Sequence, residues 1–140
     1  MRTWLLDTGP LVAYLDAGDD AHEEVAASLN EFSGLLATTS AVITEAMHLV
    51  GERRDGPRTL AAFVAASGAE VYDLCRAPEL HEAALLMEKY SDTPMDFADA
   101  TLVLLGEGLE VHEVLTLDRR GFSAYRTRRR RGFELVLDSR

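Results

Sequence analysis

The fold is decided first by residues 4–15, WLLDTGPLVAYL, in which a short apolar run passes directly into a helical pattern. The first three residues of this stretch favour a β-strand, because they are apolar and turn residues follow them at once. Pro10 suits the first turn of a helix, where its missing backbone N–H costs nothing. Apolar side chains then recur at helical spacing as far as residue 15. The stretch therefore predicts a strand joined to a helix by a short turn that carries Asp7.

Strand and helix patterns continue to alternate along the rest of the chain. The pattern predicts further strands near residues 35–38, 70–72, 111–117 and 134–137, and helices near residues 25–32, 40–50, 57–64, 78–87 and 97–105. Such alternation implies a parallel sheet with helices on both faces. We therefore expect a single α/β domain over residues 1–140, with three layers in the order α/β/α and a central, mostly parallel sheet of four or five strands.

The composition suits a domain that folds around an ordinary apolar core. The chain has 140 residues and is 47% hydrophobic, so it needs neither disulfides nor a structural metal to be stable. Cys75 is the only cysteine, which excludes an internal disulfide framework and a thiolate metal cage. The opening apolar run is soon interrupted by Asp7, and no apolar stretch is long enough to span a bilayer. We therefore expect a soluble, cytoplasmic protein without a signal peptide or membrane segment.

The charge of the chain is strongly acidic but unevenly distributed. The formal net charge is −10, whereas residues 119–140 carry 8 basic and 2 acidic side chains. An acidic protein does not attract nucleic acid through its overall field, although a local basic edge beside an acidic pocket can do so. The run Arg128–Arg131 is either a solvated loop or a phosphate-binding edge, and the sequence leaves both interpretations open.

Two acidic side chains directly follow predicted strands. Asp7 comes after the first strand, and Asp118 comes after the strand near residues 111–117. In a parallel α/β sheet, ligands bind outside the carboxyl ends of the strands, at a switch in strand order. We therefore expect Asp7 and Asp118 to converge on one crevice.

Three further acidic residues interrupt or begin apolar helical patterns. Asp96 and Asp99 are three residues apart at the start of a helix, on the same face, and Asp96 is either a helix cap or a ligand. Asp99 lies among residues expected to be buried, so it must be paired with an arginine or hold a metal. Glu45 interrupts another apolar helix and is either a surface glutamate or a ligand.

Carboxylates brought together in this way need a positive charge between them. Two unit charges about 4 Å apart repel by about 4 kcal/mol in an effective dielectric near 20. Except for Arg119 beside Asp118, no basic residue neighbours the candidates in sequence. All-oxygen ligation favours Mg²⁺, with Mn²⁺ as a substitute, over zinc. Such a site activates water and stabilises charge on a phosphate.

Four motifs in order resemble the PIN domain, particularly the VapC-type toxins of type II toxin–antitoxin systems. The motifs are LLDTGPLVA (5–13), ITE (43–45), MDFADA (95–100) and LTLDRRGF (115–122). The resemblance implies a PIN fold, Mg²⁺-dependent endoribonuclease activity, homodimers and a cognate VapB-type antitoxin. It leaves open whether the substrate is transfer, ribosomal or messenger RNA.

The resemblance also implies roles for individual residues. Asp7 and Asp99 resemble the main metal ligands, and Glu45 and Asp118 would orient water or complete the metal shell, with Asp96 as an auxiliary acid. The residues expected to hydrogen-bond within the site or to hold RNA phosphates are Thr8, Thr116, Arg119, Arg120 and Arg126. Base preference would come from loops that the sequence does not identify.

Three other interpretations compete with a metal-dependent ribonuclease. A catalytically silent PIN module would bind RNA or an antitoxin, with the carboxylates holding a structural metal or an antitoxin arginine. The triplet Asp7-Thr8-Gly9 also occurs in aspartic proteases, but those need a mostly β chain that pairs two such triplets. A phosphatase with Asp7 as nucleophile usually has a second acid two residues on, where this chain has Gly9.

Overall fold

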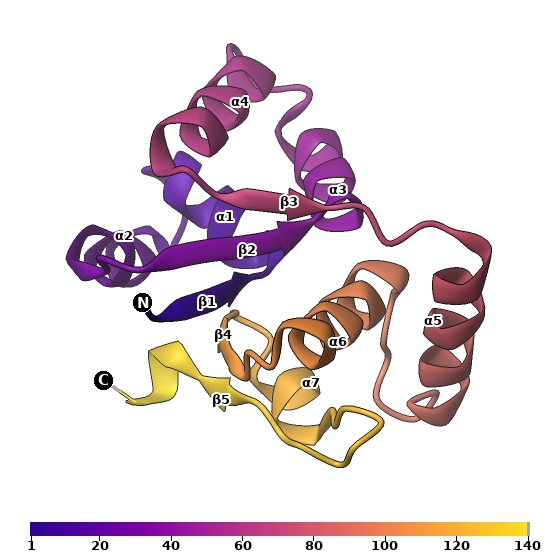
Figure 1. Ribbon diagram of the computed structural model, residues 1–140. Coiled ribbons are helices and arrows are strands. Elements are labelled where there is room, and N and C mark those ends of the chain that lie inside the picture. The colour runs from indigo at the N-terminus through magenta and orange to yellow at the C-terminus, as the bar shows by residue number, and fades with distance from the viewer. Residues whose placement is uncertain (140) are drawn as a thin grey trace.

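The computed structural model describes residues 1–139 (Figure 1). Its elements, in chain order, are β1 (Thr3–Leu6), α1 (Thr8–Leu15), α2 (His22–Glu31), β2 (Leu35–Thr39), α3 (Ser40–Val50), α4 (Gly56–Ser67), β3 (Glu70–Tyr72), α5 (Ala77–Lys89), α6 (Phe97–Leu109), β4 (Glu113–Leu115), α7 (Arg119–Ala124), β5 (Glu134–Leu135) and the 3₁₀ helix η1 (Val136–Ser139). Within these residues, no helix is long and apolar enough to cross a membrane.

The central sheet has five strands in the order β3-β2-β1-β4-β5, and every pair is parallel. The predicted α/β class and parallel sheet are therefore confirmed. Leu5 on β1 pairs with Ala37 on β2 and with Val114 on β4, so β1 is the middle strand. The chain builds outward from β1 to β2 and β3, then crosses to β4 on the other side. The switch in strand order thus lies between β1 and β4, where a ligand crevice is expected.

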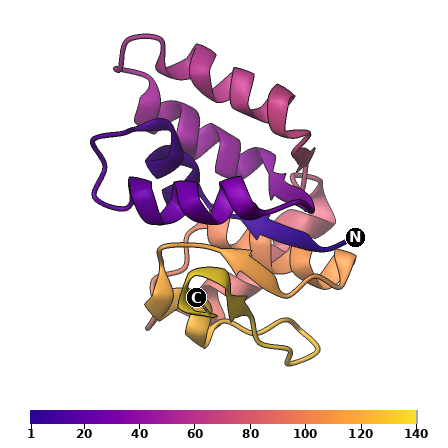
Figure 2. The same ribbon diagram turned by 90° about the vertical axis from the view of Figure 1, so that its left-hand side faces the viewer.

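Helices cover both faces of the sheet, and the alternation of side chains along β1 shows how. Leu5 packs into a core with α5, α6 and α7, whereas Trp4 and Leu6 pack into a second core with α1, α2 and α4. Helix α3 lies across the sheet edge, because Val42 joins the first core and Ala46 joins the second. Figure 2 shows α1 to α4 on one side of the strands and α6 and α7 on the other.

The predicted boundaries differ from the structure mainly after residue 110. The strand expected near residues 111–117 is shorter in the structure, where β4 spans Glu113–Leu115. Thr116 lies outside the strand, and its hydroxyl donates to Asp7. The last expected strand is β5, which passes at once into η1. Helix α7 was not expected, since six residues are too few to show a helical period.

Candidate active site

The acidic residues selected from the sequence line one cleft at the carboxyl edge of the sheet, beside the switch in strand order. The cleft has a volume of about 550 Å³. Asp7 comes from the end of β1, Glu45 from α3, Asp96 and Asp99 from the start of α6, and Asp118 from the turn after β4. The structure therefore brings all five candidates together, although the order of strands by itself predicted this only for Asp7 and Asp118.

Asp7 is the most deeply buried of the five, with 7% of its surface exposed. It is the N-cap of α1: its Oδ1 accepts a hydrogen bond from the Thr8 backbone N–H at 2.8 Å, and its Oδ2 accepts one from the Thr116 hydroxyl at 2.7 Å. Burial raises the pKa of Asp7 to about 6, although both hydrogen bonds act in the opposite direction. The charges of Asp96 and Asp118 raise the pKa further. The two hydrogen bonds thus hold the Asp7 carboxylate in one orientation, while burial makes its ionised form less stable.

Asp96 and Asp99 cap α6 reciprocally. Asp96 accepts a hydrogen bond from the backbone N–H of Asp99 at 2.8 Å, and Asp99 accepts one from the backbone N–H of Asp96 at 3.1 Å. Asp96 therefore acts as the helix cap that one interpretation of the sequence expected, while it also lines the cleft. Burial raises the pKa of Asp99 well above its usual range, and the charges of Asp7 and Asp96 add to this effect.

Asp118 caps the short helix α7 in a similar way. Its Oδ1 accepts a hydrogen bond from the Gly121 backbone N–H at 3.0 Å, and its own N–H donates to the Thr116 hydroxyl at 2.9 Å. A Cβ on Gly121 would lie 2.3 Å from the Asp118 carboxylate, so this position needs glycine. Helix N-termini carry partial positive charge, which offsets part of the repulsion between the carboxylates.

No ion pair compensates these carboxylates within the part of the chain that the structure describes. The arginine nearest in sequence, Arg119, turns away from Asp118 and pairs with Asp138 at 2.7 Å and with Glu24 at 3.3 Å. Asp99 is therefore not paired with an arginine, which was the structural alternative to a metal site. Among residues 1–139, the acidic side chains of the cleft thus have no basic side chain paired with them.

The donor atoms of the cleft fit a hard divalent cation. All of them are oxygens, as Mg²⁺ and Mn²⁺ prefer. The Thr8 hydroxyl oxygen lies buried in the same cleft wall and has no hydrogen-bond partner, in a side chain that is only 5% exposed. Among residues 1–139, however, no three acidic, histidine or cysteine side chains already converge as a closed metal site. The carboxylates thus share a cleft without meeting at a single point.

Known proteins resemble this chain in sequence and in fold. No family model matches the chain, but it is 35% identical over 123 residues to Ribonuclease VapC26 of Mycobacterium tuberculosis, covering 87% of this chain and 91% of that protein. The chain belongs to the VapC family of PIN-domain toxins. The crystal structure of Mycobacterium tuberculosis VapC20, described as a sarcin–ricin loop cleaving toxin, matches 82% of this chain and 89% of its own length. Its TM-score is 0.74 at 19% identity, which shows a shared fold.

The arginines predicted to hold RNA are placed very differently from one another. Arg120 is exposed next to Asp118, where α7 begins. Arg126 donates from its guanidinium to the backbone carbonyls of Ser123 and Tyr125, so part of its hydrogen-bonding capacity is already used. The contact of either arginine with RNA stays a prediction for this VapC-family chain.

The run Arg128–Arg131 lies at the opposite end of α6 from the cleft. Arg128 pairs with Glu107 through a 2.6 Å hydrogen bond and with Glu82 at 3.1 Å. Glu107 is eight residues beyond Asp99 on α6, which is about 12 Å along the helix axis. Arg128 therefore ties the C-terminal segment to α5 and α6 and does not line the cleft.

Tyr125 is a residue of the site that sequence reasoning missed. It is fully buried, and its hydroxyl donates a hydrogen bond to the Pro94 carbonyl at 3.1 Å, just before the turn into α6. Burial raises the pKa of Tyr125, and the nearby acidic side chains, led by Asp99, raise it further, so the phenol stays protonated. Tyr125 thereby ties the segment after α7 to the start of α6. Its spacing from the four motifs gave no signal of this contact.

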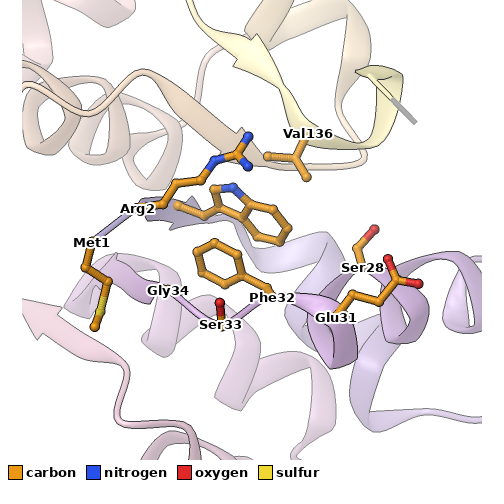
Figure 3. A pocket seen from close by; sticks show the side chains of 9 residues that line it. Met1, Arg2, Ser28, Glu31, Phe32, Ser33, Gly34 and Val136 are labelled. Carbon is orange, nitrogen blue, oxygen red and sulfur yellow. The ribbon is translucent and has the colours of Figure 1, made fainter.

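Another hollow among the described residues lies away from the carboxylates. It has a volume of about 870 Å³ and surrounds Trp4 and Phe32, whose rings stack with centroids 3.7 Å apart (Figure 3). Arg2 and Gly34 place it at the amino ends of β1 and β2. This larger hollow is thus separate from the cleft in which the acidic candidates gather.

Proposed function

We propose that this chain is an endoribonuclease toxin that hydrolyses RNA phosphodiester bonds in the cleft lined by Asp7, Glu45, Asp99 and Asp118. The observation that carries the proposal is the set of carboxylates without counter-ions at the switch in strand order, in a chain related to a named ribonuclease over most of its length. A carboxylate cleft repels RNA phosphates unless a cation lies between them. The activity is accordingly expected to require a divalent metal ion.

Asp7 and Asp99 are the residues we assign to hold the metal, Mg²⁺ or Mn²⁺. Both are partly desolvated, and both have raised pKa values that a bound cation would reverse. Asp96 and Asp118 line the same cleft, and we assign them to the remainder of the oxygen shell. When bound, the metal supplies charge stabilisation for the phosphate and lowers the pKa of water.

The protein's own groups prepare this site before RNA arrives. The Thr116 hydroxyl donates to the Asp7 carboxylate and accepts a hydrogen bond from the Asp118 backbone N–H, so it ties Asp7 to the turn that carries Asp118. Thr8 offers the unpartnered hydroxyl oxygen described above. Glu45 is half-buried on the α3 wall of the cleft. We assign to it the roles of orienting the attacking water and accepting its proton.

The same cleft provides a site for inhibition by a VapB-type antitoxin. An arginine from a partner would supply the positive charge that the described residues lack, and it would block access of metal and RNA. Such an inhibitor is expected for the family, as are a homodimer and action on RNA in the cytoplasm. The inhibitor, the homodimer and the cytoplasmic substrate are parts of the proposal, and their tests begin from protein purified without a partner.

The proposal is tested by cleavage of a labelled pool of cellular RNA with chain purified free of any partner. Reactions contain Mg²⁺, Mn²⁺ or EDTA, and they compare the wild type with Asp99→Asn and with Glu107→Gln, which changes an acidic residue on the same helix outside the cleft. Discrete fragments that need metal and Asp99, but not Glu107, are the expected result. Absence of cleavage from folded, partner-free protein would favour the catalytically silent binding module instead.

A further inference from the structure

A second hollow opens directly beside the carboxylate cleft and has no role in the function proposed above. It has a volume of about 570 Å³ and shares Glu45 and Asp96 with the cleft, so the two are continuous. One wall is the outer face of α3, and the other is the first turn of α6, with Cys75 at the rim. A strand of RNA lying across the carboxylates would therefore pass the mouth of this hollow.

The lining of the hollow combines an apolar floor with a polar rim. The floor includes Ala41, Ala98 and the half-buried ring of Phe97. An aromatic surface beside small apolar side chains suits a flat ring, and proteins commonly stack single-stranded RNA bases on aromatic side chains. The neighbouring cleft, by contrast, is lined mainly by carboxylates and suits a cation and a phosphate.

Two hydroxyl groups at the rim are available only as acceptors. The Ser40 hydroxyl donates its hydrogen to Asp73 at 3.0 Å, and the Thr44 hydroxyl donates its hydrogen to the Ser40 carbonyl at 2.8 Å. The Thr44 oxygen keeps a lone pair for a further hydrogen bond, whereas the Ser40 hydroxyl is also in contact with the Cys75 thiol. The rim therefore favours a ligand whose edge carries N–H groups, such as the amino group of adenine or cytosine or the N–H edge of guanine.

We propose that this hollow, named here the α3–α6 hollow, binds the nucleobase next to the scissile phosphate and gives the enzyme its base preference. The inference rests on the proposed function and assigns specificity to Thr44, Ser40 and Phe97. It replaces the expectation that base preference comes from loops, since the lining belongs mainly to two helices. Continuity with the cleft favours a base of the substrate over a side chain of another protein.

The test compares Thr44→Val with Thr59→Val in cleavage of a cellular RNA pool, with the new RNA ends mapped by sequencing. Thr59 is a matched control: it is exposed, its hydroxyl donates to the carbonyl four residues earlier at 2.7 Å, and it lies on α4 outside both hollows. Loss of one hydrogen bond to a base is expected to change the preference for that base about 2- to 10-fold in Thr44→Val alone.

Three outcomes of this comparison are distinguishable. A changed base preference beside the cut in Thr44→Val, with none in Thr59→Val, supports the α3–α6 hollow. Cleavage by all three proteins with the same base preference would overturn the hollow and leave the nuclease intact. Absence of metal-dependent cleavage by the wild type would overturn the proposed function and the base site with it.

Alkylation of Cys75 tests the α3–α6 hollow independently, because Cys75 is the only cysteine of the chain and is an exposed residue that lines the hollow. N-ethylmaleimide on this thiol is expected to slow RNA cleavage several-fold in the wild type but not in Cys75→Ser treated in the same way. Equal rates before and after labelling would contradict the proposal. If labelling changes the oligomeric state of the protein in solution but leaves its base preference unaltered, the hollow contacts a second copy of the chain instead of a base.

Discussion

Within the described residues, two acidic side chains far from the cleft are paired with arginines, whereas those at the carboxyl edge of the sheet are not. At the amino edge, Glu113 accepts a 2.8 Å hydrogen bond from Arg2, and at the far end of α6 Glu107 pairs with Arg128. The arginine partners lower the pKa of Glu113 and Glu107. At the carboxyl edge, Asp7 and Asp99 have no such partner and their pKa values are raised.

This difference distinguishes carboxylates that form ion pairs within the protein from carboxylates that are available to bind a cation. Glu113 and Glu107 are paired with arginines of the same chain, so these two carboxylates need no further cation. Asp7 and Asp99 at the carboxyl edge make the metal-free protein less stable when they are ionised, and either protonation or a bound cation relieves that cost. The four predictions below test whether the two sets differ in this way.

The largest expected effect is on cleavage by Asp99→Asn. Loss of one ligand to the metal should reduce the rate of RNA cleavage on the order of a hundredfold or more. Glu107→Gln on the same helix should leave the rate within about twofold, because Glu107 pairs only at the far end of α6. The cleavage rates of both variants are measured together with that of the wild type. Equal reductions in rate for Asp99→Asn and Glu107→Gln would contradict the distinction between paired and unpaired carboxylates.

A smaller effect on cleavage is expected from Thr116→Val, which removes the hydroxyl that holds Asp7. Loss of such an orienting hydrogen bond should lower activity or metal affinity about 10- to 100-fold. Thr38→Val is the matched control, since Thr38 is equally buried and its hydroxyl donates to the Leu6 backbone carbonyl at 2.7 Å, not to a carboxylate of the cleft. The account predicts similar stability losses for the two variants but an activity loss in Thr116→Val only.

The metal-free protein should become more stable as the pH falls from about 7.5 to 5. Because the folded pKa of Asp7 is raised to about 6, the folded state binds a proton more tightly than the unfolded state, and protonation relieves the cost. For Asp7 the relief amounts to about 3 kcal/mol in full, and Asp99 adds in the same direction. Denaturant titrations should show the trend weakened in Asp7→Asn and with saturating Mg²⁺. A wild-type stability that falls over this range would sink the prediction.

The smallest effect is expected from Glu113→Gln at the amino edge. Its partner Arg2 is largely exposed, so loss of the pair should lower the free energy of unfolding by about 0.2–1 kcal/mol. RNA cleavage should be unchanged. A large loss of activity in this variant would show that charge at the amino edge also contributes to function.

Much of the fold and of the cleft could be predicted because both depend on local patterns. Asp7 and Asp118 follow strands, and the carboxyl ends of parallel strands meet at one edge of a sheet. Asp99 was recognisable because a carboxylate within an apolar helix needs a partner. These three residues required no knowledge of how distant segments pack.

The remaining features depend on tertiary contacts that leave no period in the sequence. Arg128 turns to Glu107 only because the chain after α7 runs back along α6. Tyr125 reaches Pro94 for the same reason. The α3–α6 hollow exists only where Thr44 and Phe97, more than fifty residues apart in sequence, face the same space.

Binding of Mn²⁺ to partner-free protein tests the central claim most directly, because it measures the metal site without an RNA substrate. Calorimetric titrations compare the wild type, Asp99→Asn and Glu107→Gln at pH 7.5. The account predicts binding to the wild type and to Glu107→Gln, and loss of at least about tenfold in affinity for Asp99→Asn. Equal Mn²⁺ affinity in all three proteins, or no binding to the wild type, would contradict a metal site built on the unpaired carboxylates of the cleft.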